Sequence, residues 1–254
     1  WYTKFGFKCI GDTIDRKQFL KGGKHSKWQP LILLKEDKNM PKRGECYDAG
    51  FTRMAMWVSN AQKTIDDLNQ RNIRPSGPLI HDEMVGIAVY KDPDNFCIYI
   101  HEFHKRIGLI INLIKLRYRA QEPWIFHFSQ NLTNISKFGF LYDKIGLKKI
   151  YEGDTSIIQT KTLPAFGLNE NDIVKMYRII KIPKDAFQLC IMEWTKPKTE
   201  HKGAEKLNTI TISVKDLHSE MKRLKDEGLN TLSIKKAILP IYGEIEVGSV
   251  NVDG

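Results

Sequence analysis

Four residues on two predicted strands carry side chains that could bind a small molecule together. Arg53 and Trp57 lie in "RMAMWV", and Tyr99 and His101 lie in "CIYIHEF". Successive side chains of a strand point to opposite faces, so residues two or four apart share a face. A guanidinium pairs with a carboxylate and an indole stacks on an aromatic ring, so this set suits an anionic or aromatic ligand. The alternative is an arginine tied internally within a filled core.

Other reactive patterns are incomplete. The stretch "HEFH" at 101–104 is not the H-E-x-x-H of a helical metal site, so we interpret it as a histidine pair at a rim. The stretch "GKHSK" at 23–27 lacks the spacing of a phosphate-binding loop, and neither a Ser-His-Asp order nor a set of Rossmann glycines is present. Nucleophilic and nicotinamide chemistry therefore have no support.

The elements that hold these residues recur along the chain. A strand-like run, a capping residue and a helix pattern follow one another at 53–73, 124–141 and 209–229, with Asn60 and Asp216 as predicted helix caps. Strand–turn–strand patterns follow at 84–103 and 175–194, and 27–36 reads as a closing strand. We infer four units of the plan βαβββ, of which the first lacks its opening strand and the fourth its last strand.

Tandem units with "V-x-[DN]" after the first strand and "D-P-D-[GN]" before the last resemble the vicinal-oxygen-chelate superfamily. "AGFTRMAMWV" with "DPDNFCIYI" carries most of this resemblance, and "FQLCIMEW" supports it. The resemblance implies an α+β fold in which four βαβββ modules pair into two open cupped β-barrels with helices outside. The first barrel would span 1–104 and the second 123–254, with a linker at 105–122 packed across both; a membrane-surface helix is the alternative for the linker.

The superfamily binds a divalent metal through one residue from each opening strand and one from each closing strand. The matching positions in this chain are Leu31, Arg53, Tyr99, Trp124, Cys190 and Thr209. A cation and apolar side chains cannot ligate a metal, and one thiol is not a site, so we predict neither metal nor cofactor. Shifting the register of the third opening strand by one residue would instead turn His127 inward.

The second barrel has its own candidate ligand residues on the predicted inner faces of its strands. They are Trp124, Gln188, Cys190, Met192, Thr209 and Thr211. This set is more apolar than the first, and core filling is the alternative interpretation. The insertion at 160–172 could be a lid or an ordinary surface loop.

Composition limits the partners. The net charge is +10, but the basic residues are scattered without an RNA-binding signature, so we do not predict nucleic-acid binding. The longest apolar run, 107–114, is too short to span a bilayer. The four cysteines lie far apart and form no C-x-x-C, and two of them fall in apolar strand-like runs, which is typical of buried thiols in a reducing compartment. We predict a cytoplasmic or mitochondrial-matrix location.

The residues favour a non-enzymatic role. We predict a metal-free protein of the superfamily that binds a small anionic or aromatic molecule, or serves as a structural subunit beside other protein subunits. The alternative is an enzyme of the lyase, isomerase or dioxygenase type. Such an enzyme would use ligands from strands absent here, or run without metal on Arg53, Tyr99 and His101.

Overall fold

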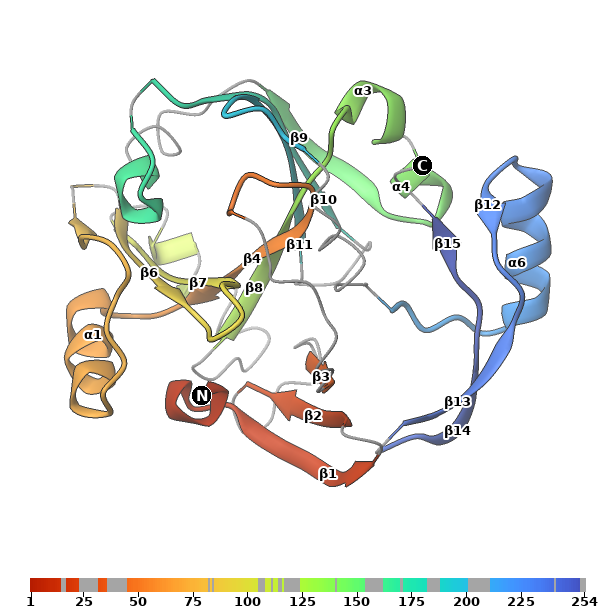
Figure 1. Ribbon diagram of the computed structural model, residues 1–254, viewed down its shortest axis with the longest axis horizontal. Helices are drawn as coiled ribbons and strands as arrows, with labels where there is room; N and C mark the ends of the chain where they lie inside the picture. The colour runs from red at the N-terminus through yellow and green to blue at the C-terminus, as the bar shows by residue number, and fades with distance from the viewer. Residues whose placement is uncertain are drawn as a thin grey trace.

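The structure is a computed structural model with a mixed α+β fold (Figure 1). It describes residues 1–14, 17–22, 32–35, 45–81, 83, 85–104, 108–110, 112–113, 116, 124–139, 141–153, 162–169, 171–181, 188–200, 211–239 and 241–251. Leu31 and Thr209, two of the predicted metal positions, lie outside these ranges.

One large mixed sheet dominates the fold. Its strands are β4 (Gly50–Trp57), β5 (Ile80–His81), β6 (Val85–Lys91), β7 (Cys97–Phe103), β8 (Trp124–Asn131), β9 (Lys148–Gly153), β10 (Ile173–Lys181) and β11 (Gln188–Lys196). The spatial order is β5-β6-β7-β4-β8-β11-β10-β9, with β5 and β9 at the two edges. In the described part of the chain this sheet is therefore open.

The centre of the sheet joins the second and third predicted units. β4 and β8 pair antiparallel, while β7 lies parallel to β4 and β11 lies parallel to β8. The sequence analysis had paired the first unit with the second and the third with the fourth. The sheet instead crosses the predicted boundary between 1–104 and 123–254, and the predicted two-barrel arrangement is not confirmed.

Smaller sheets come from the two ends of the chain. One contains β1 (Lys8–Ile14), β2 (Lys17–Lys21) and β3 (Ile32–Lys35), after the short helix η1 (Tyr2–Phe5). Two further pairs are β13 (Lys235–Leu239) with β14 (Gly243–Val247), and β12 (Asn230–Thr231) with β15 (Val250–Asn251). Figure 1 shows the end of β1 beside the β13–β14 hairpin, and the rings of Phe19 and Tyr242 meet there at 5.8 Å.

The helices begin at polar caps. Asn60 caps α1 (Ala61–Gln70) and Asp216 caps α6 (Leu217–Asp226), as predicted, through side-chain oxygens that accept backbone N–H groups. Asn134 caps α3 (Ile135–Phe138) in the same way, and α4 (Leu141–Lys144) follows it. None of the helices in the described residues is long and apolar enough to cross a membrane.

One predicted element differs from the structure. Residues 211–214 are not a strand, and both Thr211 and Val214 are exposed. In the predicted linker, the described residues 108–110, 112–113 and 116 are helical. Their apolar side chains are 57–74% exposed; they are Leu109, Ile110, Leu113 and Leu116.

The two faces of the large sheet carry different residues. The outer face packs on α1 through Met54, Met56, Ile98 and Ile100. We call the opposite side the inner face; its apolar residues include Ala55, Val89 and Tyr99, and they pack on the short helix η2 (Leu163–Phe166). Figure 1 shows α1 and η2 on opposite sides of the sheet.

Candidate functional site

Arg53 is the central charged group of the inner face. Its position on β4 lies opposite Cys97 of β7 and Ser129 of β8, and the residue is 5% exposed. Nη2 donates to Oδ1 of Asn131 at 3.5 Å and approaches Sδ of Met192 at 3.1 Å. Both acceptors are weak partners for a cation, because one contact is long and the other is to a thioether.

Aromatic rings and an unmatched charge complete the surroundings of Arg53. The guanidinium carbon lies 5.2 Å from the ring centre of Phe166 and 5.6 Å from that of Trp194. Nε makes no hydrogen bond, and among the described residues no carboxylate pairs with this arginine. A buried cation without an acidic partner is costly, since it loses its water and regains little.

Asn131 fixes this end of the inner face. The residue is fully buried, and its Nδ2 donates to the carbonyl oxygens of Cys46 and Asp48, both at 2.8 Å. Its Oδ1 also accepts the indole N–H of Trp194 at 3.1 Å. The residues around Arg53 are thus held by a satisfied polar network, which makes the free Nε stand out.

A second polar pair lies two residues further along β4. Tyr99 and His127 flank Ala55 on the neighbouring strands, and the hydroxyl of Tyr99 hydrogen-bonds Nε2 of His127. The small side chain of Ala55 leaves room for this contact. Burial lowers the pKa of His127 well below its usual value and raises that of Tyr99, so both side chains are neutral near pH 7.

His101 lies beyond this pair, opposite Trp57. It is 6% exposed and packs on the ring of Phe103 at 3.9 Å, and neither ring nitrogen has a hydrogen-bond partner. Burial lowers the pKa of His101 to about 3, and the nearby His104 adds to this effect. The hydroxyl of Ser129 is also buried and lies beside Tyr99 and Cys190.

The structure places on one face of one sheet several candidate ligand residues that the sequence analysis had assigned to two different barrels. Arg53, Tyr99 and His101 share the inner face with residues of β8 and β11, as the strand alternation predicted for each strand separately. Those residues of β8 and β11 are Trp124, Cys190 and Met192. Gln188 is half-buried at the start of β11, opposite His127.

Trp57 packs against a second tryptophan. Its ring stacks on Trp124 across β4 and β8, with centroids 5.2 Å apart and an angle of 9° between the planes. Both rings are buried and also contact Phe103 or Phe126. This tryptophan pair therefore closes one end of the inner face and leaves no free indole face for a ligand between the two rings.

His127 is the inner-face residue that the preferred register missed. The pairing of β4 with β8 shifts between Ala55–His127 and Met56–Ile125, so Phe126 is an extra residue in a bulge. Trp124 and His127 consequently lie on the same face, while Phe128 packs with the outer clusters. Strict alternation cannot pass through a bulge, and nothing in "WIFHFSQN" marks one.

The described residues of the predicted donor set do not form a complete set of ligands for a divalent metal. Arg53 is a cation without a lone pair to donate, and burial raises the pKa of the Tyr99 phenol and raises that of the Cys190 thiol to about 11. His127 already uses Nε2 for the hydroxyl of Tyr99. Within the described ranges, no group of three or more His, Cys, Asp or Glu side chains is placed to hold a metal ion.

Comparison with known proteins identifies the fold. No family model and no curated protein matches the sequence. Among solved structures, glyoxalase I from Zea mays is similar at a TM-score of 0.58 and 13% identity over 100% of this chain and 83% of that one. A putative dioxygenase from Bacillus subtilis is similar at 0.54 and 11% identity over 91% and 70%. The protein therefore has the fold of the vicinal-oxygen-chelate superfamily.

Proposed function

We propose that this protein binds a small carboxylate without a metal, and that Arg53 holds the carboxylate. The observation that carries the proposal is a buried guanidinium with a free Nε and no acidic partner among the described residues. It stands where the superfamily resemblance places a metal ligand. An anionic ligand would supply the negative charge that the guanidinium of Arg53 lacks.

A carboxylate suits this place better than a phosphate. The described surroundings hold one cation among apolar and aromatic side chains, including Phe166, Trp194 and Leu168. A monoanion balances one guanidinium, whereas a dianion would keep an unpaired charge in a dry place. The planar carboxylate also matches the fork of Arg donors.

The role of Arg53 is tested by replacing it with methionine and measuring urea unfolding without added anion. We expect Arg53→Met to be more stable than the wild type by about 1–3 kcal/mol, because an unpaired buried charge is exchanged for an apolar chain. Arg178 is the matched control, since it is largely buried but pairs with Glu152. Arg178→Met should lose about 1 kcal/mol. A destabilised Arg53→Met would show that the arginine is a structural group.

Ligand binding is tested by thermal unfolding with acetate, benzoate, sulfate and phosphate. Carboxylates should raise the Tm of the wild type and leave that of Arg53→Met unchanged. Metal analysis of the purified protein should find well below one equivalent of any transition metal. A stoichiometric metal would favour the alternative, a metal-dependent enzyme.

A structural subunit is the second candidate. It is favoured by the ring of Phe166, which covers the guanidinium of Arg53 from the η2 side. For this role, every carboxylate should leave the Tm unchanged, and the protein should co-purify with a defined partner. The same thermal-unfolding measurements therefore distinguish a ligand-binding protein from a structural subunit.

A further inference from the structure

We infer that Phe166 occupies the place of the ligand's own ring, and that the ligand class is the aromatic monocarboxylates. This inference rests on the proposed function. It starts from the contacts of the Phe166 ring, which lies 5.2 Å from the guanidinium carbon of Arg53 and 5.3 Å from the ring of Tyr99. These are the contacts that an aryl group bound beside Arg53 would make.

The turn that carries Phe166 is anchored without it. Leu163 and Ala165 are 3% and 1% exposed, and Gly167 ends η2 in the left-handed region with φ 74°. Gly77 packs so closely that a Cβ there would lie 2.5 Å from the carbonyl oxygen of Ala165. The backbone of η2 is thus firmly seated.

The side chain of Phe166 differs from these anchors because it is only half-buried. Its ring lies between the inner face and the surface. A rotation of this one side chain would take its ring away from the guanidinium of Arg53 while Leu163 and Ala165 keep their packing. Such rotations are fast compared with the movement of a whole segment. The ring therefore acts as an internal competitor for an aryl ligand.

The positive charge of Arg53 determines the second group of the ligand, which is a carboxylate attached to the aromatic ring. The place of the Phe166 ring is apolar and aromatic, yet the guanidinium of Arg53 beside it has an Nε without a hydrogen-bond partner. A carboxylate attached directly to a ring in that place can reach the guanidinium without a spacer. Benzoate is the simplest molecule of this kind.

The test is calorimetric titration of the full chain with benzoate, the neutral isostere benzamide, and cyclohexanecarboxylate. We expect Phe166→Ala to bind benzoate at least tenfold more tightly than the wild type, because the competing ring is gone. Benzamide and cyclohexanecarboxylate should each bind at least tenfold more weakly than benzoate, and the double variant with Arg53→Met should lose benzoate binding. Phe166→Leu is the second variant if the alanine protein does not fold.

Phe103→Ala is the matched control, because it removes a phenyl ring from the inner face beside the neutral His101 instead of Arg53. It should gain no affinity for benzoate. Equal benzoate affinity in the wild type and Phe166→Ala, still dependent on Arg53, would overturn the role of Phe166 and leave the proposed function intact. Absence of Arg53-dependent binding by any carboxylate would overturn both.

Discussion

A guanidinium that leaves water on folding must recover that free energy from hydrogen bonds, aromatic faces or an anion. Arg53 obtains two aromatic faces and two weak acceptors, whereas Arg178 obtains Glu152. The contrast between these arginines is the basis for treating Arg53 as a binding group. The carboxylate of a ligand would provide what Glu152 provides for Arg178.

Buried neutral histidines make the stability of this protein sensitive to acid. The pKa of His101 is about 3 in the folded state, whereas an unfolded histidine has a pKa of about 6.5. Below pH 6.5, His101 binds a proton in the unfolded chain but stays neutral in the folded protein. The free energy of unfolding therefore decreases as pH falls toward 3. His127 acts in the same direction.

Replacing His101 with phenylalanine should flatten this pH dependence. Between pH 6 and pH 4, we expect the free energy of unfolding of His101→Phe to fall by about 1.4 kcal/mol less per pH unit than that of the wild type. Urea unfolding at several pH values measures this difference. Equal slopes would mean that His101 is protonated in the folded protein.

The inner-face residues could be predicted from the sequence wherever the strand is regular. Alternation placed Arg53, Tyr99 and Cys190 on one face, and the parallel pairings β4–β7 and β8–β11 keep a regular register at these positions. His127 could not be placed, since its face depends on the bulge at Phe126. The covering ring of Phe166 comes from an insertion, which strand periodicity does not describe.

Elements of the second and third units are tied by the same kind of contact. Glu102 of β7 accepts the N–H of Ala61 at the start of α1, and Glu193 of β11 accepts that of Ile135 at the start of α3. A carboxylate at a helix N-terminus satisfies an otherwise free donor and interacts favourably with the helix dipole. These contacts link each closing strand to the helix of its own unit.

Replacing Glu193 with alanine should be clearly destabilising. The residue is 6% exposed, and its removal leaves the buried N–H of Ile135 without its acceptor, at 2.8 Å in the native protein. We expect a loss of about 1–3 kcal/mol in urea unfolding. Glu244 is the control, since its ion pair with Lys236 is exposed; its replacement should change stability by less than about 0.5 kcal/mol. Equal losses would show that the cap contributes nothing.

Helix starts were predictable at this scale, and strand partners were not. Asn60 and Asp216 cap helices because short polar side chains before an apolar pattern favour that geometry. Periodicity shows which face of a strand is buried, but it does not say which strand lies beside it. The antiparallel pairing of β4 with β8 therefore emerged only from the structure.

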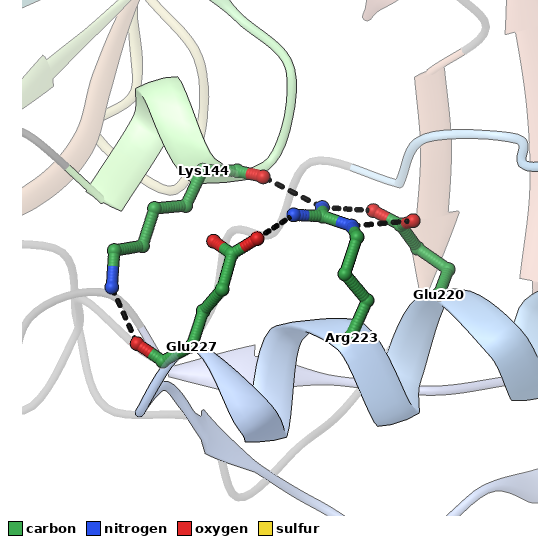
Figure 2. Close-up of polar contacts among 4 residues, drawn as sticks. All are labelled: Lys144, Glu220, Arg223 and Glu227. Atoms are coloured by element: carbon green, nitrogen blue, oxygen red, sulfur yellow. Dashed lines mark hydrogen bonds and ion pairs between the residues drawn. The ribbon is translucent and has the colours of Figure 1, made fainter.

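At the scale of the whole molecule, the question is what holds the C-terminal elements against the large sheet. Part of the answer is a polar network between α6 and α4 (Figure 2). Arg223 donates from Nη2 to the carbonyl oxygen of Lys144 at 2.7 Å, and it also pairs with Glu220 and Glu227. Lys144 in turn donates from Nζ to the carbonyl oxygen of Glu227.

Both directions of this network use carbonyl oxygens near the C-terminal ends of helices. Such carbonyls lack partners within their own helix, so a cation from the other element satisfies them and offsets the negative end of the dipole. The two carboxylates on α6 hold the guanidinium of Arg223 in a fixed orientation. Residues of α6 thus orient the guanidinium of Arg223, which donates a hydrogen bond to a carbonyl oxygen of α4.

Replacing Arg223 with methionine should loosen the C-terminal elements while the large sheet stays intact. We expect amide hydrogen exchange to become several-fold faster in α6 and in the β13–β14 hairpin, and to stay unchanged in β4 and β8, because the α6–α4 contact holds the C-terminal elements and not the centre of the large sheet. Lys222→Met is the control, since Lys222 pairs with Asp226 within α6 and does not reach α4. If both variants exchange alike, the contact with Lys144 does not hold α6 in place, and packing of Met221 and Leu224 must do so instead.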